Sequence, residues 1–302
     1  MVDITHKNNT LRIATAQAVV SVSKHETIYA LENKTVPKGD VFEMAKTAGL
    51  FAAKRTADMI PDCHPLPIEY TKISYEISGL DVIVLVEIKT IYKTGVEVEA
   101  MHAASVVALT MYDMLKPIDK EIEIKNIKLL QKKGGKADKK DEFETPIKTS
   151  VLVCSDSISS GKKEDLSGKI IIEKLQNEPV EICHYNIVPD GVESVQSQIK
   201  KYLSQQIELI VVTGGTGLSK RDFTPEAIKP LLDREIPGIG EHLRHYGQDR
   251  MPHAILSRSI GGLIGNTLVI ALPGSSNGAK ESMEALFPSI LHIFKMIHSG
   301  KH

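Results

Sequence analysis

The sequence contains no tryptophan, and aromatic residues make up only 5% of its 302 residues. Proteins that bind nucleic acids commonly stack bases on aromatic side chains and carry an excess of positive charge. This chain has neither feature, because it is poor in aromatic residues and its formal net charge is −1. We therefore expect no nucleic acid partner, and an anionic ligand must be held by local positive charge.

Cysteine and long apolar runs are also scarce. Cys63, Cys154 and Cys183 are odd in number and far apart, which argues against a disulfide framework and a closed zinc site. No apolar run approaches the roughly 18 residues of a membrane span, and the first residues, MVDITHKNNTLR, lack the apolar core of a signal peptide. We expect a cytoplasmic protein with reduced thiols and no membrane partner.

The length favours two domains of about 150 residues each. Apolar periodicity stops in the segment LLQKKGGKADKKDEFETPIKTS, where glycine, lysine and acidic residues take over. We place a first domain at 1–137, a linker at 138–148 and a second domain at 149–302. The lysines of the linker are expected to be solvated.

The first half predicts a layer of strands covered by helices. Asp40 is a plausible N-cap for the first helix and Pro61 its stop, and Pro117 ends the second helix. Helices are predicted at 40–60 and 99–116, and strands at 70–79, 80–93 and 121–131. Strands that are neighbours in sequence, with helices on one face, indicate an α+β domain.

Asp113 and Lys116 are three residues apart on the second predicted helix and therefore share one of its faces. Glu97 and Glu99 flank Val98 just before that helix. A carboxylate beside an ammonium group can act as an acid/base pair with a shifted pKa. The same spacing also occurs in ordinary surface ion pairs, and taken alone it favours such an ion pair over an acid/base pair.

The stretch IPDCHPLP, 60–67, places Cys63 and His64 between prolines. A metal site is disfavoured because the sequence offers no further ligands at the spacing that zinc sites need. A Cys–His nucleophile pair is also disfavoured, because adjacent side chains of an extended segment point to opposite faces. The prolines restrict the backbone around both residues. We predict a stiff segment that presents His64 to a ligand, while Cys63 packs or contributes only its backbone.

Six motifs occur in order through the first half: KGD, AAKRT, CHPL, KTGVEVEA, YDMLK and KKGGK. Together, from MVDIT to GGK, they resemble the MoaC family, the cyclic pyranopterin monophosphate synthases of molybdenum cofactor biosynthesis. Two departures are Asp62 before the Cys-His pair, where the family often has an apolar residue, and KKGGKAD in place of KSGGKSG.

The resemblance implies a ferredoxin-like α+β domain and a lyase that needs no cofactor. The reaction converts 3′,8-cyclo-7,8-dihydroguanosine triphosphate to cyclic pyranopterin monophosphate and diphosphate. It implies Asp113 as the catalytic acid/base, opposite His64, with lysines at the reacting end. It also implies an active site across a subunit interface, hence a homo-oligomer, hexameric or trimer-based. The implied catalytic residues are Asp113, Lys116, Lys38 and Lys132, and the implied substrate-binding residues are Asp62, Cys63, His64, Val98, Glu99, Glu97 and Arg12. A triphosphate requires several cations, which these lysines, Arg12 and His64 would supply.

The second half alternates strands with helices, which predicts a three-layer α/β domain with a parallel sheet. Ligands of such sheets bind beyond the carboxyl ends of the strands. Three loops follow predicted strands: SDSISSGKKEDLSG, VPDG and TGGTGLSKRD. The glycines would let backbone N–H groups approach an anion, and Thr224 is predicted to cap the helix that follows.

With DREIPGIGEHLR, AILSRSIGG and LPGSSNGAKE, these loops resemble the MoaB/MogA family, the molybdopterin adenylyltransferases of the same pathway. The resemblance implies transfer of AMP from ATP to molybdopterin with magnesium. Asp190 and Asp222 are the candidate magnesium ligands, and hard oxygen donors suit that ion. The candidate nucleotide- and pterin-binding residues are Asp190, Gly214, Gly215, Thr216, Gly217, Asp222, Ser275 and Ser276.

Three hypotheses follow for the whole chain. The first is a bifunctional enzyme, a lyase followed by an adenylyltransferase, with the cyclised GTP derivative and molybdopterin as substrates. The second is the same lyase with a catalytically silent module that binds pterin and promotes oligomerisation. The third, a nucleotide-sensing regulator without chemistry, is disfavoured because binding alone does not need an acid/base pair beside phosphate-binding lysines.

Overall fold

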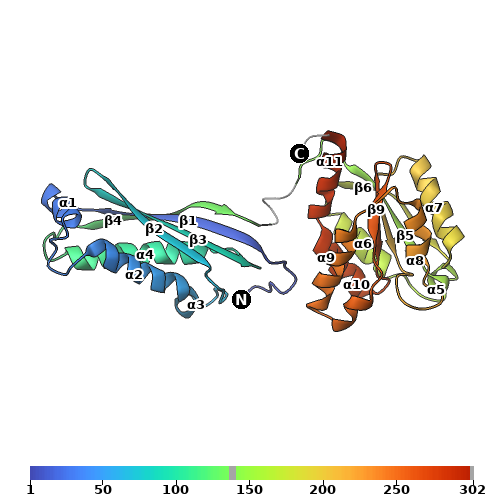
Figure 1. Cartoon of the computed structure of the whole chain (residues 1–302), viewed down its shortest axis with the longest axis horizontal. Helices are drawn as coiled ribbons and strands as arrows, with labels where there is room; N and C mark the ends of the chain where they lie inside the picture. The colour runs from blue at the N-terminus through green and yellow to red at the C-terminus, as the bar shows by residue number, and fades with distance from the viewer. Residues whose placement is uncertain (136–140, 300–302) are drawn as a thin grey trace. The chain divides into compact units, whose positions relative to one another are not determined.

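The computed structural model describes residues 1–135 and 141–299, which fold into two compact units, Met1–Asp138 and Lys139–His302 (Figure 1). Residues 138–140 of the predicted linker lie outside the described residues. Beyond them, Phe143 packs against the core of the second unit, and Asp141 forms ion pairs with His292 and Lys295 at 2.8 and 3.0 Å. No helix among the described residues is long and apolar enough to cross a membrane.

The first unit is a four-stranded antiparallel sheet in the order β2-β3-β1-β4, with α2 and α4 packed on it. Alternate residues of β3, from Val82 to Ile88, are fully buried, whereas those between them are half-buried. This alternation has the period of two expected when one face of a sheet carries the core. The elements are β1 (Thr10–Ser21), α1 (His25–Glu32), α2 (Val41–Lys54), α3 (Thr56–Met59), β2 (Tyr70–Ser78), β3 (Asp81–Tyr92), α4 (Glu97–Leu115) and β4 (Glu123–Lys133).

The two helices and three strands predicted for this half are confirmed, with two corrections. Asp40 is the N-cap of α2, since its carboxylate accepts the Glu43 N–H at 3.2 Å. The predicted helix over 40–60 is divided at Arg55. The central strand β1 was not predicted, because its inward side chains include Ala14, Ala16 and Ala18, which are small and weakly favour strands.

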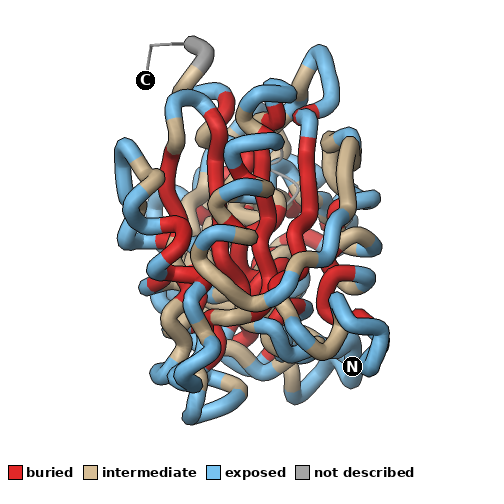
Figure 2. Tube along the Cα trace, turned by 90° about the vertical axis from the view of Figure 1, so that its right-hand side faces the viewer, coloured by how far each residue is buried: buried red, intermediate tan, exposed pale blue. Residues whose placement is uncertain are grey.

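The second unit has a six-stranded sheet in the order β6-β5-β7-β10-β9-β8, covered on both faces. Its inner strands are the most buried segments, with β7 and β10 buried throughout (Figure 2), whereas the edge strands β6 and β8 have no buried residue. One hydrophobic cluster packs side chains of α6, α9, α10 and α11 on the sheet, and another packs α7 and α8 on it. The elements are β5 (Ile147–Cys154), α5 (Asp156–Ser159), α6 (Ser167–Leu175), β6 (Val180–Val188), α7 (Val192–Ser204), β7 (Leu209–Thr213), α8 (Thr224–Ile228), η2 (Lys229–Leu231), β8 (Arg234–Glu235), α9 (Pro237–Gln248), η3 (Pro252–Leu256), β9 (Gly261–Ile264), β10 (Thr267–Leu272), α10 (Ser276–Leu286), η4 (Ser289–Leu291) and α11 (His292–Ser299).

The three-layer α/β prediction is confirmed, but the sheet is mixed. Strands β6, β5, β7 and β10 are parallel, whereas β9 runs antiparallel to β10 and to β8. Only Gly265 and Asn266 connect β9 to β10. Such a short connection joins antiparallel strands, since a parallel pair needs a crossover of a dozen or more residues.

Candidate functional site

Asp113 lies in the last turn of α4, between two ammonium groups. Its Oδ1 is 2.7 Å from Lys116 Nζ, and its Oδ2 is 2.7 Å from Lys38 Nζ. Lys38 comes from the loop between α1 and α2 and also donates to the Asp113 carbonyl at 2.8 Å. The hydrogen bond from Lys116, followed by that from Lys38, lowers the pKa of Asp113 to about 2. The predicted contact between Asp113 and Lys116 is thus present, and Lys38 joins it.

A second group of charged residues lies at the other end of α4. Glu97 is the first residue of the helix and Glu99 lies in its first turn, so the prediction that both precede the helix was wrong. Lys132 Nζ is 3.5 Å from Glu97 Oε1, and Arg12 donates to the carbonyls of Tyr92 and Lys93 at 3.3 and 3.4 Å. A cavity of about 280 Å³ here is lined by one carboxylate, that of Glu97, and by the cations of Lys7, Arg12, Lys93, Lys132 and Lys133. Sequence reasoning missed Lys7, Lys93 and Lys133.

The two ends of α4 do not meet within one chain. Glu97 and Asp113 lie on the same helix, sixteen positions apart, which corresponds to about 24 Å at 1.5 Å per residue. Lys38 and Lys116 therefore lie with Asp113 at one end, and Arg12 and Lys132 lie at the other. The predicted set of phosphate-binding cations is divided between two places on the chain.

Cys63 contacts Glu99 at the amino-terminal end of α4. The thiol donates to Glu99 Oε1 at 3.1 Å, and Glu99 is only 2% exposed. The Glu99 Oε2 atom has no hydrogen-bond partner among the described residues. Burial raises the pKa of Glu99, and burial together with the Glu99 carboxylate raises the pKa of Cys63 to about 12. The prediction that Cys63 only packs or contributes its backbone was therefore wrong, because its side chain binds a buried carboxyl group.

The neighbours of Cys63 contact the first residues of the chain. His64 Nε2 is 2.8 Å from the Val2 carbonyl oxygen, and Asp62 pairs with the Met1 amino group at 2.6 Å. Val98 is exposed on the first turn of α4. His64 therefore lies on the side of Glu99, and within one chain it does not face Asp113.

We predict that the Cys63 thiol reacts slowly with iodoacetamide. At about pH 8, a thiol with a pKa near 12 has a thiolate fraction on the order of a thousandfold lower than that of a free cysteine. Mass spectrometry of the Cys63 peptide should show little labelling in the folded chain and rapid labelling in urea. Glu99→Gln should raise the folded-state rate only modestly, because burial is the larger cause. Equal labelling of folded and unfolded chains would contradict this prediction.

The glycine-rich loop of the second unit begins at the carboxyl end of β7. Gly214 has φ of +98°, and a Cβ there would lie 2.2 Å from the Cys154 carbonyl oxygen; Gly215 has φ of +64° and is equally crowded by Thr224. The Thr224 hydroxyl donates to the Gly214 carbonyl at 2.7 Å. Thr224 is the first residue of α8 and Phe223 occupies the N-cap position, so the prediction of Thr224 as the cap was wrong. Its hydroxyl closes the glycine turn instead.

Three aspartates lie near one another at the carboxyl edge of this sheet. Asp190 Oδ2 accepts the Asp156 N–H at 3.1 Å, and Asp156 Oδ1 accepts the Asp190 N–H at 3.0 Å. Asp222 Oδ2 accepts the Ser219 N–H at 2.7 Å. Burial raises the pKa of Asp190, and the carboxylates of Asp156 and Asp222 add to this effect. Carboxylate oxygens are the hard donors that magnesium prefers, and this ion takes few protein ligands. The described residues contain no group of three or more His, Cys, Asp or Glu side chains able to hold a metal ion. Sequence reasoning missed Asp156, although it follows β5 as Asp190 follows β6.

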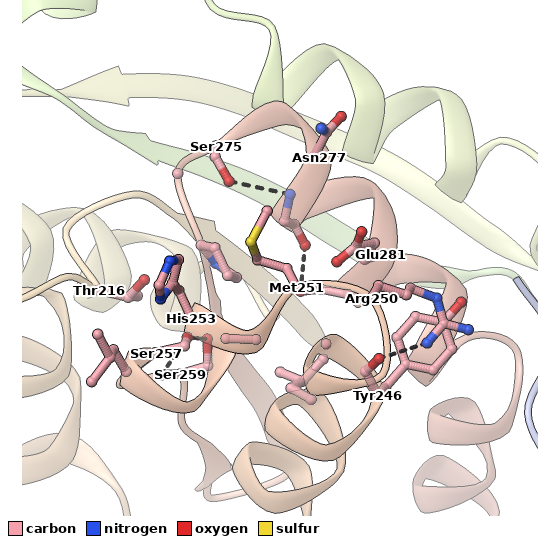
Figure 3. A pocket seen from close by; sticks show the side chains of 18 of the residues that line it. Thr216, Tyr246, Arg250, Met251, His253, Ser257, Ser259, Ser275, Asn277 and Glu281 are labelled. Carbon is pink, nitrogen blue, oxygen red and sulfur yellow. Dashed lines mark hydrogen bonds between the residues drawn. The ribbon is translucent and has the colours of Figure 1, made fainter.

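A cavity of about 720 Å³ lies beside this loop (Figure 3). The predicted residues Thr216, Gly217, Ser275 and Ser276 line it, whereas Asp190, Gly214, Gly215 and Asp222 are not among its lining residues. Ser275 is the N-cap of α10 and accepts the Gly278 N–H at 3.2 Å. Polar lining residues that sequence reasoning missed include Tyr246, Arg250, His253, Ser257 and Glu281.

Arg250 and Tyr246 form one wall of the cavity. The Arg250 guanidinium lies 3.4 Å from the centre of the Tyr246 ring and donates to the Tyr246 carbonyl at 2.6 Å. A fixed cation and an aromatic ring beside serine hydroxyls are typical of a site for a polar heterocycle with an anionic group. No sequence signal indicated these two residues, because they come from α9 and the segment that follows it, far in sequence from the glycine-rich loop.

These features define a class: a two-unit protein with an antiparallel α+β unit bearing a Lys-Asp-Lys cluster, and an α/β unit with a glycine-rich loop beside a polar cavity. The sequence profile of the MoaC family matches residues 1–135, and that of a family described as "Probable molybdopterin binding domain" matches residues 150–292. The chain belongs to the family of bifunctional molybdenum cofactor biosynthesis proteins.

Individual relatives match either the whole chain or one of its halves. The molybdenum cofactor biosynthesis bifunctional protein of Chlorobaculum tepidum is 40% identical over 302 residues, which cover 100% of this chain and 96% of that protein. The cyclic pyranopterin monophosphate synthase of Nitratidesulfovibrio vulgaris is 46% identical over 139 residues, covering 45% of this chain and 86% of that protein. The crystal structure of the tungsten cofactor synthesizing protein MoaB from Pyrococcus furiosus is 34% identical, covers 52% of this chain and 99% of that one, and has a TM-score of 0.49.

Proposed function

We propose that the first unit converts the cyclised GTP derivative to cyclic pyranopterin monophosphate with release of diphosphate, as a lyase. We further propose that the second unit adenylylates molybdopterin. The observation that carries the first proposal is the position of Asp113 between Lys38 and Lys116, each at 2.7 Å. The βαββαβ order of the long elements, with β1 and β3 central, supports a ferredoxin-like classification of this unit.

The Lys-Asp-Lys cluster suits proton transfer next to a phosphate. With both ammonium groups bound to it, the Asp113 carboxylate is a weak base. When substrate phosphates draw Lys38 or Lys116 away, the carboxylate loses a stabilising partner and its pKa rises toward the ordinary value. Substrate binding would thereby make Asp113 a better proton acceptor at the moment it is needed.

We propose that the complete first site forms between two chains. Asp113 and Lys132 lie at opposite ends of α4, so one bound nucleotide contacts both only if a second chain brings its own α4 end alongside. The cation-lined cavity at Arg12 and Lys132 would then hold phosphates next to the partner's Lys-Asp-Lys cluster. A homo-oligomer is therefore part of this proposal, and the first reaction needs no cofactor.

For the second unit, molybdopterin would occupy the cavity lined by Ser275, Arg250 and Tyr246, and backbone amides of the glycine-rich loop would bind phosphate. Asp190 and Asp222 would hold magnesium, which supplies charge neutralisation at the phosphates of ATP. Asp156 would orient Asp190 through their reciprocal hydrogen bonds.

A second candidate for this unit is pterin binding without catalysis. The cavity is lined by Thr216 and Ser275 but by neither Asp190 nor Asp222, so pterin could bind without reaching the carboxylates. An adenylylation assay on the intact wild-type chain, with magnesium, ATP and molybdopterin, separates the two candidates.

We predict that Asp222→Asn lowers magnesium-dependent adenylylation roughly a hundredfold. Asparagine retains an oxygen that accepts the Ser219 N–H, so the loop keeps its shape while the negative charge is lost. The apparent magnesium requirement should rise in the same variant. Glu164→Gln, which removes the charge of an exposed carboxylate paired with Lys169, is the control and should leave the rate unchanged. Wild-type kinetics for Asp222→Asn would reject Asp222 as a magnesium ligand.

A further inference from the structure

Arg258 binds the glycine-rich loop near both of its ends. Its backbone N–H donates to the Thr216 carbonyl at 3.2 Å, and its Nε donates to the Gly217 carbonyl at 2.8 Å. One of its terminal nitrogens, Nη2, donates to the Asp222 carbonyl at 2.6 Å. A single residue therefore joins the part of the loop that lines the cavity to the part that carries the candidate magnesium ligand.

The geometry of these contacts requires a guanidinium group. The other terminal nitrogen, Nη1, pairs with Glu226 of α8. Arginine presents several N–H donors in one rigid plane, whereas a lysine ammonium is a single point that cannot span the same acceptors. The carbonyls of Gly217 and Asp222 and the Glu226 carboxylate are thus held by one planar group.

The backbone that carries Arg258 is itself fixed. Arg244 of α9 donates to the carbonyls of Ser257 and Ser259, at 3.3 and 3.4 Å. These two serines flank Arg258 and line the cavity, as Thr216 and Gly217 do from the other side. Arg244 therefore holds the backbone on both sides of Arg258, and Arg258 holds the glycine-rich loop. Together they connect helix α9 to the loop through the wall of the cavity.

Holding these carbonyls also sets the direction of loop amides. In a trans peptide unit the C=O and the following N–H point in opposite directions. Because the carbonyls of Thr216 and Gly217 point to Arg258, the N–H groups of Gly217 and Leu218 point away from it. Among the described residues, neither N–H group has a hydrogen-bond partner. Two oriented, unpaired amides at a glycine turn are suited to bind a phosphate oxygen.

We propose that Arg258 is a positioning residue for adenylyl transfer. It orients the amides of Gly217 and Leu218 toward a phosphate and holds Asp222 at the other end of the loop. This inference rests on the proposed adenylyltransferase function. Arg258 has no contact with substrate in this proposal, so a substitution of Arg258 must act on the reaction through the loop.

The test compares three variants of the full chain with the wild type. Arg258→Lys keeps the charge for Glu226 but loses the planar set of donors. Glu226→Gln weakens the ion pair but leaves the carbonyl contacts, and Lys229→Met breaks only a surface pair with Glu235. Each variant is assayed for adenylylation of molybdopterin with ATP, for hydrogen exchange of the amides at 216–222 and for cyclic pyranopterin monophosphate formation as an internal reference.

Arg258→Lys should lower kcat/KM for adenylylation at least about tenfold. It should also speed exchange of the Ser219 and Asp222 amides, which are hydrogen-bonded within the loop in the wild type. Glu226→Gln should change kcat/KM less than about twofold, and Lys229→Met should match the wild type. Wild-type exchange or wild-type kinetics for Arg258→Lys would overturn the proposal, as would an equal loss in Glu226→Gln. A wild-type chain that does not adenylylate molybdopterin would reject the proposed function instead, and the exchange measurement would still decide whether Arg258 fixes the loop.

Discussion

Replacing Asp113 with asparagine is expected to lower kcat for cyclic pyranopterin monophosphate formation by about a thousandfold, within the range for loss of a general acid/base. Asparagine is nearly isosteric, and its single carbonyl oxygen can still accept a hydrogen bond from Lys38 or Lys116, but it does not take up a proton at neutral pH. The substrate should therefore bind with a similar KM while the proton-transfer step fails. The measurement is steady-state turnover of the purified full chain, with circular dichroism to confirm its fold.

The matched control for this experiment is Asp81→Asn. Asp81 also forms an exposed ion pair in the first unit, 2.6 Å from Lys125, and its carboxylate also has a lowered pKa. It lies at the start of β3 and belongs to none of the proposed sites. Loss of activity in Asp81→Asn would show that breaking a surface ion pair is enough, and undiminished turnover of Asp113→Asn would refute its role as the acid/base.

Co-expression of two inactive chains is expected to restore about a quarter of the wild-type activity if each first site is built from two chains. The variants are Asp113→Asn and Lys132→Met, which lie at opposite ends of α4. In random assemblies, one site in about four receives Asp113 from the Lys132→Met chain and Lys132 from the Asp113→Asn chain. Two different affinity tags would isolate the mixed oligomers for assay.

The control pair for this restoration is Asp113→Asn with Lys116→Met. These residues contact each other within one chain, so every site lacks one of them and no activity should return. Restoration in the control pair would contradict the contact between Asp113 and Lys116. No restoration with Lys132→Met would place Asp113 and Lys132 of the same chain in one site and reject the two-chain proposal.

The sequence by itself predicted the features that depend on neighbours along the chain. The spacing of Asp113 and Lys116 predicted their contact, because residues three apart share a helix face. The cap at Asp40 and the strand-helix alternation of the second half likewise depend on local propensity and hydrophobic period. The ordered motifs of both halves indicated the family, which the comparisons confirm.

The tertiary structure decided which distant segments meet. Lys38 contacts Asp113 across 75 positions of sequence, and Arg258 contacts Gly217 across 41. No local sequence pattern encodes either contact. The helix that brings Asp113 to Lys116 also separates Asp113 from Lys132, so its length divided a set of cations that the sequence suggested would act together. Such contacts depend on strand register and packing summed over a whole unit, whereas sequence periodicity reports only the face on which each side chain lies.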